Sequence, residues 1–597
     1  MDKIRVKVGM ASCGVAAGAR DVYLKLEDHI RQHSLPVELS KTACLGMCFI
    51  EPLVELTGSD LGKVTLGQVD QENICGLLDE YLANKVPSSN IVQAEKLDAP
   101  YNGLLAKQKR IVLQNCGVID PLSIDDYESR GGYQALKKAL TLPPEEIIAE
   151  VKDSGLRGRG GAGFSTGLKW SFAAAAKSPK KYVVCDADEG DPGAFMDRSV
   201  LEGDPHKILE GMIIGAYAMG ADEGYIYCRA EYPLAIAHLT VAIAAAEERH
   251  YLGKNILGTD FSFELTIKEG AGAFVCGEET ALMQSIEGKR GMPNYKPPFP
   301  STKGLHGKPT VVNNVETIAN VPHIINNGFE WFNTIGTKQS KGTKLFSVSG
   351  KVNRVCLLEV PFGTPLSKLV ELAGGVPEGQ KLKAVQIGGP SGECIIPEDL
   401  QTPIDFESFK NKGLAMGAGG VIVYDDTVCI IDMVKYFMNF IKHESCGKCI
   451  PCREGSQRML DILTAISSRP ANSDGHGSLE RFKGVILLES MAEVMRDTSL
   501  CGLGQTASNP LISALKHFKN EFEEHIFERK CVAGVCRNLR IYYIDVEKCT
   551  GCAACAKRCP TNAIIGTPRS PYFVVEEKCI GCGICEEVCK FSSVFFK

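Results

Sequence analysis

Eight cysteines near the C-terminal end repeat one spacing twice. The first run reads C-x2-C-x2-C-x3-C and is followed by Pro560, and the second run has the same spacing but is followed by Lys590. Three thiolates two residues apart surround one face of an iron-sulfur cube, and the fourth, set off by a turn, ligates the neighbouring cube. The spacing therefore predicts two 4Fe-4S clusters with exchanged fourth ligands, held by Cys549, Cys552, Cys555 and Cys589 and by Cys579, Cys582, Cys585 and Cys559.

Disulfides and zinc are the alternatives for such a tail. A zinc site takes four ligands around one ion, which does not explain a triple run with an offset fourth thiol. The chain opens with a strand-like alternation and lacks the apolar core of a signal peptide. We therefore expect a cytoplasmic protein, in which most of the 25 cysteines are reduced and clusters of them indicate metal.

Composition excludes two other classes of partner. The formal net charge of -6 gives no reason to expect nucleic acid, which favours a basic face. No stretch approaches the roughly 18 uninterrupted apolar residues of a membrane span. The hydrophobic content of 44% is ordinary for a globular chain with large cores.

The order of strand-like and helical segments predicts five domains in a multidomain α/β protein. A compact α/β unit spans 1-90 and ends in a polar run from Lys85 that is interpreted as a linker. The other domains are a Gly-rich α/β domain, a β-rich module, a helical bundle and the cysteine-rich tail, over 91–335, 336–428, 429–530 and 531–597.

A third set of cysteines lies in the helical region. The segment "ESCGKCIPCREG" supplies three close thiols, and "SLCGLG" supplies one far downstream. This arrangement suits a 4Fe-4S cluster within a helical bundle, with structural zinc as the alternative. The predicted ligands are Cys446, Cys449, Cys452 and Cys501.

A glycine-rich segment begins at Gly155 and contains G-x-G-x-x-G as Gly158, Gly160 and Gly163. The usual dinucleotide loop follows a strand, whereas "PPEEIIAEVKDSG" before this one predicts a helix, which weakens the standard Rossmann interpretation. Bare backbone N–H groups near Lys169 still suit a phosphate. Further polar segments are an acidic turn after "KYVVC", a predicted helix opening at Gly277, and "KPPFPSTKG" with "KPTVVNNVET".

Together these segments resemble the flavin- and NADH-binding subunit family shared by respiratory complex I, NAD-linked hydrogenases and NAD-linked formate dehydrogenases. The resemblance covers about residues 100–530. It implies FMN held by Gly158, Arg159, Gly160, Gly161, Lys169, Asp186, Asp188, Glu189, Gly277, Glu278, Asn313, Asn314 and Thr317. It implies that Phe164, Phe172, Glu279, Lys296 and Phe299 face the nicotinamide nucleotide, the aromatic rings stacking on it.

Asp186 and Asp191 depart from the family's "NADESEPG" signature, which has Asn and Glu there. Both positions belong to the expected cofactor site, so the changes bear on nucleotide preference or flavin potential. The resemblance further implies a Rossmann-like FMN/NADH domain and a ubiquitin-like β-rich module of the soluble-ligand-binding type. An independent ligand-binding role for that module is the alternative.

The first domain resembles a thioredoxin-like 2Fe-2S ferredoxin through "ASCGVAAGA" and "TACLGMCFIEPLVEL". Cys13, Cys44 and Cys48 match three of four ligands, but the first is absent at Val8 and its neighbours. Either Ser12 substitutes for the missing thiol, or the domain has kept its fold and lost its cluster.

Between the bundle and the tail lie His525, Cys531 and Cys536, which suit zinc but lack a fourth ligand. Two packed thiols beside a surface imidazole are the alternative. The remaining single cysteines are expected in packed surroundings, namely Cys75, Cys116, Cys185, Cys228, Cys276, Cys356, Cys394 and Cys429.

A flavin domain joined to an N-terminal ferredoxin-like domain and a two-cluster tail most resembles the diaphorase subunit of multimeric, often electron-bifurcating, iron-only hydrogenases. Electrons would pass between NAD(H) or NADP(H), FMN and the clusters. Implied partners are a hydrogenase catalytic subunit, a small 2Fe-2S subunit and soluble ferredoxin. The alternatives are the equivalent subunit of a formate dehydrogenase and an electron-transfer adaptor without nucleotide chemistry.

Overall fold

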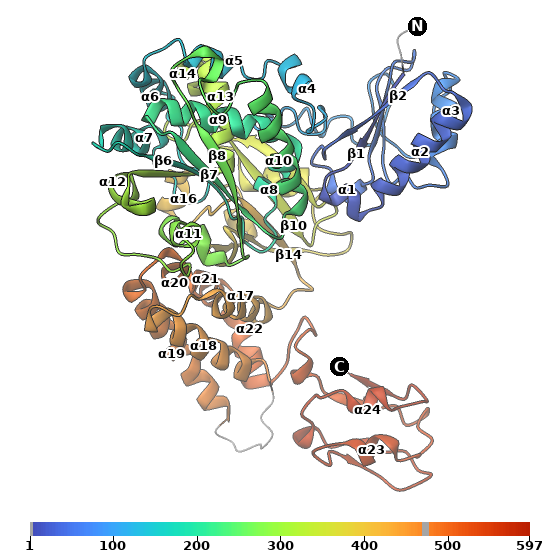
Figure 1. The fold of residues 1–597 in the computed structure, drawn as a ribbon. Helices are drawn as coiled ribbons and strands as arrows, with labels where there is room; N and C mark the ends of the chain where they lie inside the picture. Colours follow the sequence, from blue (N-terminus) through green and yellow to red (C-terminus); the bar gives the residue numbers. More distant parts are fainter. Residues whose placement is uncertain (1–3, 469–476, 597) are drawn as a thin grey trace. The chain divides into compact units, whose positions relative to one another are not determined.

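The computed structural model describes residues 4–468 and 477–596, which fall into two compact units (Figure 1). The first unit holds the described residues up to Pro377 together with Ile387–Gly389 and Glu398–Val423. The second unit holds Glu378–Gln386, Pro390–Pro397 and the described residues from Tyr424 onward. The boundary between the units passes through the β-rich module predicted for 336–428, whose extent stays a prediction.

The N-terminal part of the first unit is a five-stranded sheet. Its order is β2 (Val37–Thr42), β1 (Ile4–Gly9), β3 (Val54–Thr57), β4 (Val64–Leu66) and β5 (Ile91–Ala94). β1 pairs in parallel with β2 and antiparallel with β3. Helices α1 (Ser12–Ala16), α2 (Ala19–His33) and α3 (Ile74–Leu82) accompany the sheet, and α2 and α3 contribute Leu26 and Leu78 to its apolar core.

The polar run from Lys85 is not a linker, contrary to the prediction. Strand β5, which follows it, pairs antiparallel with β4, so the run is a loop inside the sheet. The Asn90 side chain holds the loop by donating hydrogen bonds to the carbonyls of Gly67 and Gln68. Polar composition indicated an exposed segment but could not show that the next strand returns to the same sheet.

The centre of the first unit is a parallel sheet with the order β8 (Glu264–Gly270), β7 (Glu223–Arg229), β6 (Tyr182–Ala187) and β9 (Thr310–Asn314). Helix α9 (Pro205–Met219) packs on β6 and β7, α10 (Pro233–Glu248) packs on β8, and α13 (Val315–Asn327) packs on β6 and β9 (Figure 1). Successive strands move from β6 to β7 and β8, and the chain then returns to place β9 on the other side of β6. Such a reversal of strand order creates a crevice at the carboxyl ends, where ligands bind in open parallel sheets.

Shorter helices surround this sheet. They are α4 (Ile124–Ser129), α5 (Gln134–Ala139), α6 (Pro144–Asp153), α7 (Thr166–Ala175), α8 (Met196–Gly203), α11 (Glu279–Ile286), α12 (Pro300–Lys303) and α14 (Phe329–Asn333). The helix predicted before the glycine-rich segment is confirmed as α6, which has proline in its first turn. Further strands of this unit are β10 (Thr343–Gly350), which pairs antiparallel with β11 (Cys356–Pro361) and in parallel with β14 (Gly420–Asp425). Helices α15 (Leu366–Leu372) and α16 (Phe406–Asn411) accompany them.

The second unit contains the helices α17 (Ile430–Glu444), α18 (Ile450–Ile466), α19 (Gly477–Thr498), α20 (Gly502–Thr506), α21 (Asn509–His517) and α22 (Lys519–Glu523). Its last part pairs β15 (Tyr542–Ile544) with β18 (Val594–Phe596) and β16 (Ile564–Ile565) with β17 (Phe573–Val574). Two short helices, α23 (Ala554–Arg558) and α24 (Ile584–Glu587), contact each other between these strands. Strands β12 (Leu382–Ile387) and β13 (Glu393–Ile395) fall mostly in this unit.

None of the helices in residues 4–468 and 477–596 combines the length and the apolar character that crossing a bilayer requires.

Candidate functional site: a nucleotide crevice and five groups of thiols

The glycine-rich loop lies at the carboxyl end of β9, beside the strand-order reversal. The Arg159 backbone N–H donates to Thr317 Oγ1 at 2.8 Å, which ties the loop to the first turn of α13. A Cβ placed on Gly160 would lie 3.1 Å from Asn314 Cβ, and Gly161 has a φ of +119°. Backbone therefore approaches this crevice more closely than side chains would permit, as phosphate-binding loops require.

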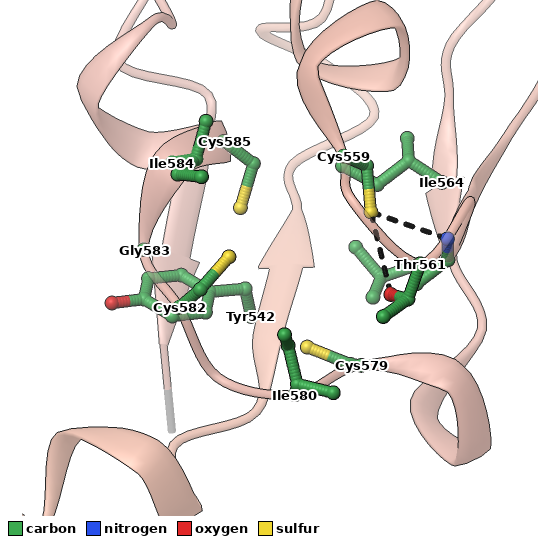
Figure 2. A pocket seen from close by; sticks show the side chains of 12 residues that line it. Tyr542, Cys559, Thr561, Ile564, Cys579, Ile580, Cys582, Gly583, Ile584 and Cys585 are labelled. Carbon is green, nitrogen blue, oxygen red and sulfur yellow. Dashed lines mark hydrogen bonds between the residues drawn. The ribbon is translucent and has the colours of Figure 1, made fainter. Parts of the chain in front are cut away.

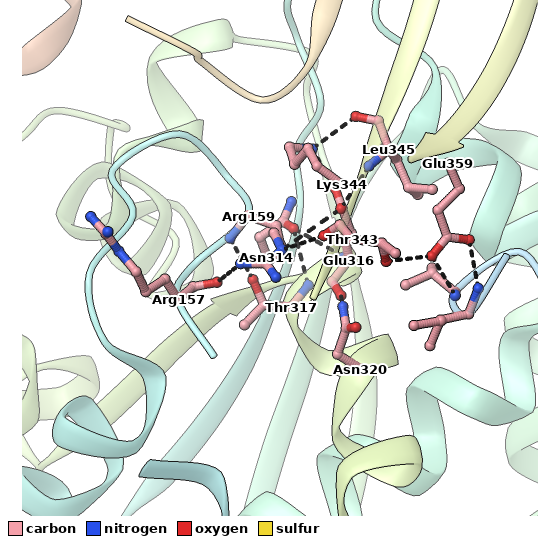
Figure 3. Close-up of polar contacts among 12 residues, drawn as sticks. Arg157, Arg159, Asn314, Glu316, Thr317, Asn320, Thr343, Lys344, Leu345 and Glu359 are labelled. Carbon is pink, nitrogen blue, oxygen red and sulfur yellow. Dashed lines mark hydrogen bonds and ion pairs between the residues drawn. The ribbon is translucent and has the colours of Figure 1, made fainter. Parts of the chain in front are cut away.

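A buried ion cluster supports the loop from beneath (Figure 3). Lys344 forms an ion pair with Glu316 of α13, and Glu316 Oε1 also accepts the Leu345 N–H at 2.9 Å. The guanidinium of Arg159 lies 3.9 Å from Glu316. Burial raises the pKa of Glu316 although Lys344 and Arg159 oppose the rise.

The Arg159 side chain contacts the backbone of the protein, and its predicted contact with FMN stays a prediction. The side chain is buried and donates to the carbonyl oxygens of Arg157, Lys341 and Thr343 at 2.7, 2.7 and 3.1 Å. A cationic residue in a glycine loop predicts an anion site. Here the planar guanidinium group of Arg159 donates hydrogen bonds to three backbone segments and so connects them. The role of Arg159 is to hold the loop in place.

The acidic turn after β6 divides into two roles. Glu189 is buried, and its carboxylate accepts the N–H groups of Met196 and Asp197 at 2.7 and 3.2 Å, so it caps α8, while its predicted contact with FMN stays a prediction. Asp186 lies at the strand end, where burial and the charge of Asp188 raise its pKa well above the ordinary value. A protonated Asp186 offers the crevice both a donor and an acceptor.

Asp191 provides a test through pH. Burial, and secondarily Glu189, raise its pKa from 3.8 to about 7. A raised acid pKa favours the protonated folded form, so its stabilising contribution is complete below about pH 4 and is lost as pH rises through about 7. We expect Asp191→Asn to flatten the pH dependence of unfolding across this window and to stabilise the unit at pH 8 by on the order of 2 kcal/mol. Denaturant melts at pH 5 and pH 8 check this, and parallel curves for both proteins would contradict it.

The expected nicotinamide side of the crevice combines an ion network with exposed aromatic rings. Glu279 pairs with Lys169 at 2.8 Å and with Lys296 at 2.7 Å, and these ammonium groups outweigh the effect of burial and lower the pKa of Glu279. The three aromatic side chains expected on this side, Phe164, Phe172 and Phe299, are each more than half exposed. Uncovered rings beside charged groups suit the planar base of a nucleotide.

Other expected cofactor residues act as helix caps or supports. The predicted helix at Gly277 begins instead at Glu279, because Glu278 is the cap whose carboxylate accepts the Thr280 and Ala281 N–H groups. Asn314 caps α13 by accepting the Glu316 N–H at 3.0 Å. Asn313 Oδ1 accepts the Trp170 indole N–H at 2.9 Å. A Cβ placed on Gly277 would lie 3.5 Å from the Asp188 carbonyl oxygen.

The tail cysteines assemble as two exchanged sets. One pocket is lined by Cys559 together with Cys579, Cys582 and Cys585, and by the apolar side chains of Ile564, Ile580 and Tyr542 (Figure 2). A second pocket is lined by Cys549, Cys552, Cys555 and Cys589. The Ala563 N–H points at Cys559 Sγ at 3.2 Å, as a donor to a cluster-bound thiolate does. The sets brought together are those that the spacing predicts.

The exchange can be tested by removing one fourth ligand. We expect Cys559→Ala to lose about four irons and to damage the centre of the Cys579 run, although Cys559 belongs to the other run in the sequence. Cys589→Ala should damage the centre of the Cys549 run. Iron analysis combined with EPR of each variant measures this. Damage confined to the run that contains the substituted cysteine would show that the ligands are not exchanged.

The bundle thiols meet where two helices begin. Cys449 caps α18, Cys452 lies in its first turn, and Cys501 caps α20, which contacts α18. Burial, and then the charges of Cys449, Cys501 and Cys446, raise the pKa of Cys452 to about 11. Because the charges of three of these thiols act on Cys452, the four thiols lie near one another, which suits a single cluster.

Cys429 supplies the fourth donor that the sequence could not place beside His525. Cys429 Sγ lies 3.4 Å from His525 Nε2 and 3.7 Å from Cys536 Sγ, and Cys531 completes a group whose ligand atoms lie within 4.8 Å of one another. His525 Nδ1 lies 2.7 Å from the Glu521 carbonyl oxygen, which directs Nε2 toward the thiols. Cys429 is buried, as expected, and the structure adds that it belongs to this group of candidate ligands.

Cys13, Cys44 and Cys48 are also brought together, with sulfur atoms within 4.8 Å of one another. Ser12, considered above as a substitute ligand, is committed elsewhere, because its backbone N–H donates to Glu202 at 2.9 Å and its hydroxyl donates to the same carboxylate. The other single cysteines are buried apart from Cys75, which is partly exposed.

Comparison with known proteins agrees with this division of the chain. Residues 151–323 match the Nuo51 FMN-binding domain, and residues 432–525 match the iron-sulfur binding region of NADH-ubiquinone oxidoreductase-F. Residues 345–393 match the SLBB domain, and residues 541–590 match the 4Fe-4S dicluster domain.

Similar whole chains extend the match. The NADP-reducing hydrogenase subunit HndC of Solidesulfovibrio fructosivorans is 53% identical over 489 residues, covering 82% of this chain and 98% of that one. An NADH-quinone oxidoreductase subunit of Rhizobium meliloti strain 1021 is 47% identical over 423 residues, covering 70% and 98%. A structure of an NAD+-reducing NiFe hydrogenase in the H2-reduced state superimposes with a TM-score of 0.60 at 31% identity, covering 88% and 84%. The chain therefore belongs to the family of 51 kDa-type NADH-binding flavoprotein subunits.

Proposed function

We propose that the chain is the diaphorase subunit of a multimeric NAD(P)-linked iron-only hydrogenase, passing electrons between NAD(P)H and iron-sulfur clusters through FMN. The observation that carries the proposal is the approach of a side-chain-free glycine loop to the strand-order reversal between β6 and β9. A nucleotide crevice of this kind, in a chain with three sets of four cluster-type cysteines, serves electron transfer better than ligand storage.

The residues of the crevice fit FMN and a nicotinamide nucleotide. Gly160 and Gly161 would admit the flavin phosphate, and the carboxyl group of Asp186 and the amide of Asn313 would face its polar edge. Phe164, Phe172 and Phe299 would stack on the nucleotide and exclude water from the reacting faces. Bound FMN supplies the chemistry that exchanges two electrons at once on one side and single electrons on the other.

The ion network at Glu279 would position the nucleotide. Lys169 and Lys296 hold the Glu279 carboxylate in its charged form, so it is available to accept hydrogen bonds from ribose or carboxamide groups.

The thiols define the onward path and the proposed content of metal. Three 4Fe-4S clusters would be held by the bundle set and the two tail sets, and a zinc ion by Cys429, His525, Cys531 and Cys536. A closed site with three sulfurs and one imidazole is typical of structural zinc. The tail would exchange electrons with soluble ferredoxin or with the cytoplasmic partner chains.

The experiment is anaerobic purification of the complex that contains this chain. We expect one FMN per chain, bleaching of its absorption by NADH or NADPH, and copurification with a hydrogen-evolving chain and a small 2Fe-2S subunit. Hydrogen evolution that needs NAD(P)H and reduced ferredoxin together would show bifurcation. A molybdenum- or tungsten-containing partner would assign the chain to a formate dehydrogenase, and a chain without flavin would be an electron-transfer adaptor.

A further inference from the structure

The three-thiol group of the first domain is too compact for the two-iron centre that its resemblance implies. Cys13 lies in α1, Cys44 follows β2, and Cys48 starts a turn of 3-10 helix, so three separate segments meet here. Cys44 and Cys48 have sulfur atoms 3.9 Å apart, and all three sulfur atoms lie within 4.8 Å of one another.

The distances discriminate between one metal ion and two. Ligands on one tetrahedral ion with metal–sulfur bonds of about 2.3 Å are separated by roughly 3.8 Å. In a 2Fe-2S cluster, two such tetrahedra share an edge formed by the two sulfides. Protein ligands that bind different metal ions are then roughly 5 to 6.5 Å apart. Any three ligands of a 2Fe-2S cluster include at least two that bind different irons and are therefore widely separated. The sulfur atoms of Cys13, Cys44 and Cys48 are all within 4.8 Å of one another, so they contain no such pair.

Glu51 lies beside the three-thiol group, outside the set of atoms that are all within 4.8 Å of one another, and is the candidate for a fourth donor. Its Oε1 lies 3.5 Å from Cys13 Sγ, its carboxylate also interacts with Cys44, and the residue is only 8% exposed. Oε2 accepts the Leu53 N–H at 2.9 Å, which fixes the orientation of the carboxylate. A bound cation would stabilise the charged form of this buried carboxyl group, which contacts Cys13 and Cys44.

A backbone N–H group and a cationic side chain lie beside Cys44. The Gly46 N–H points at Cys44 Sγ at 3.2 Å, and the charge of the partly buried Arg110 is close enough to act on Cys44. Arg110 is held by donating to the Leu45 carbonyl at 2.8 Å. Backbone donors and a fixed cation around thiolates are the usual surroundings of a metal site.

We propose that Cys13, Cys44, Cys48 and Glu51 bind a single divalent ion of the zinc class in a closed tetrahedral site. Thiolates select zinc over calcium or magnesium, and four protein donors leave no open position for catalysis. The ion fastens α1 to the loop that follows β2, which stabilises a small domain. The N-terminal domain then lies outside the electron path.

The proposal is tested first by metal analysis of the full chain after anaerobic purification. We expect about twelve irons, and about two zinc ions if the Cys429 group also holds zinc. About fourteen irons would indicate a 2Fe-2S centre in this domain and overturn the proposal. Twelve irons with zinc only at the Cys429 group would overturn it as well.

Variants assign the ion to these residues. Cys44→Ser should lose one zinc per chain at unchanged iron, and Glu51→Gln should release zinc to a chelator at least roughly tenfold faster, whereas Glu51→Cys should retain it. Cys75→Ser and Glu72→Gln remove a thiol and an exposed carboxylate of the same domain outside the site and should behave as wild type. Loss of two irons from Cys44→Ser, or no change in zinc in any variant, would contradict the proposal. FMN content and bleaching by NADH, measured on the same samples, report separately on the proposed function.

Discussion

The Gly161→Val variant is expected to purify without flavin and to lose dye reduction by NADH. Gly161 has a φ of +119°, a region that a β-branched residue cannot adopt without strain. A Cβ at this position would also lie 3.4 Å from the backbone of Gly417. Strain on the order of 3 kcal/mol converts to roughly 100-fold weaker flavin binding. FMN analysis and fluorescence titration of the apoprotein measure the effect.

Gly131→Val is the matched control. Gly131 also has positive φ, at +85°, but nothing lies within 4 Å of its Cβ position. It should share the backbone strain and retain the flavin. If Gly161→Val retains one FMN per chain, the glycine loop is not part of the cofactor site.

The second large effect is expected from Lys344→Met. The ammonium group of Lys344 is buried against the Glu316 carboxylate and also donates to the Ala418 carbonyl at 2.6 Å. Removing one partner of a buried ion pair leaves an uncompensated charge and typically costs about 3–5 kcal/mol. Because Glu316 lies in the first turn of α13, beneath the glycine loop, flavin retention should fall as well.

Tryptophan fluorescence in denaturant measures this loss. The chain has two tryptophans, Trp170 and Trp331, and both lie in the first unit. Lys412→Met breaks an exposed ion pair with Asp399 and should change stability by less than about 1 kcal/mol. Adding Glu316→Gln to Lys344→Met should recover part of the stability. Equal effects of the two lysine variants would show that the buried pair contributes no more than a surface pair.

The cysteine runs could be predicted because local spacing determines which thiols share a face. Cys549, Cys552 and Cys555 lie in one turn-rich segment, and their geometry depends little on the rest of the fold. Cys429 could not be predicted, because it is far from His525 in the sequence and meets it only after α17 and α22 pack together. No spacing pattern encodes a contact of that range.

Charged residues of the flavin crevice were harder to interpret than its glycines. Arg159 and Glu189 occur in a loop and a turn where ligand contacts are common, yet one donates to three carbonyls and the other caps α8. The sequence shows which hydrogen-bonding groups a side chain carries. Its partners depend on which backbone groups the fold leaves unpaired, and the sequence does not show these. Glycine positions are more informative, because a backbone conformation or a close approach is required at the residue itself.

The exchanged tail ligands impose an order on biosynthesis. Cys589, which joins the pocket of Cys549, Cys552 and Cys555, belongs to the second run. The run translated first therefore cannot close its centre until the second run has also been made. Neither run can complete a centre by itself, so iron insertion at both tail centres has to wait until both runs are present.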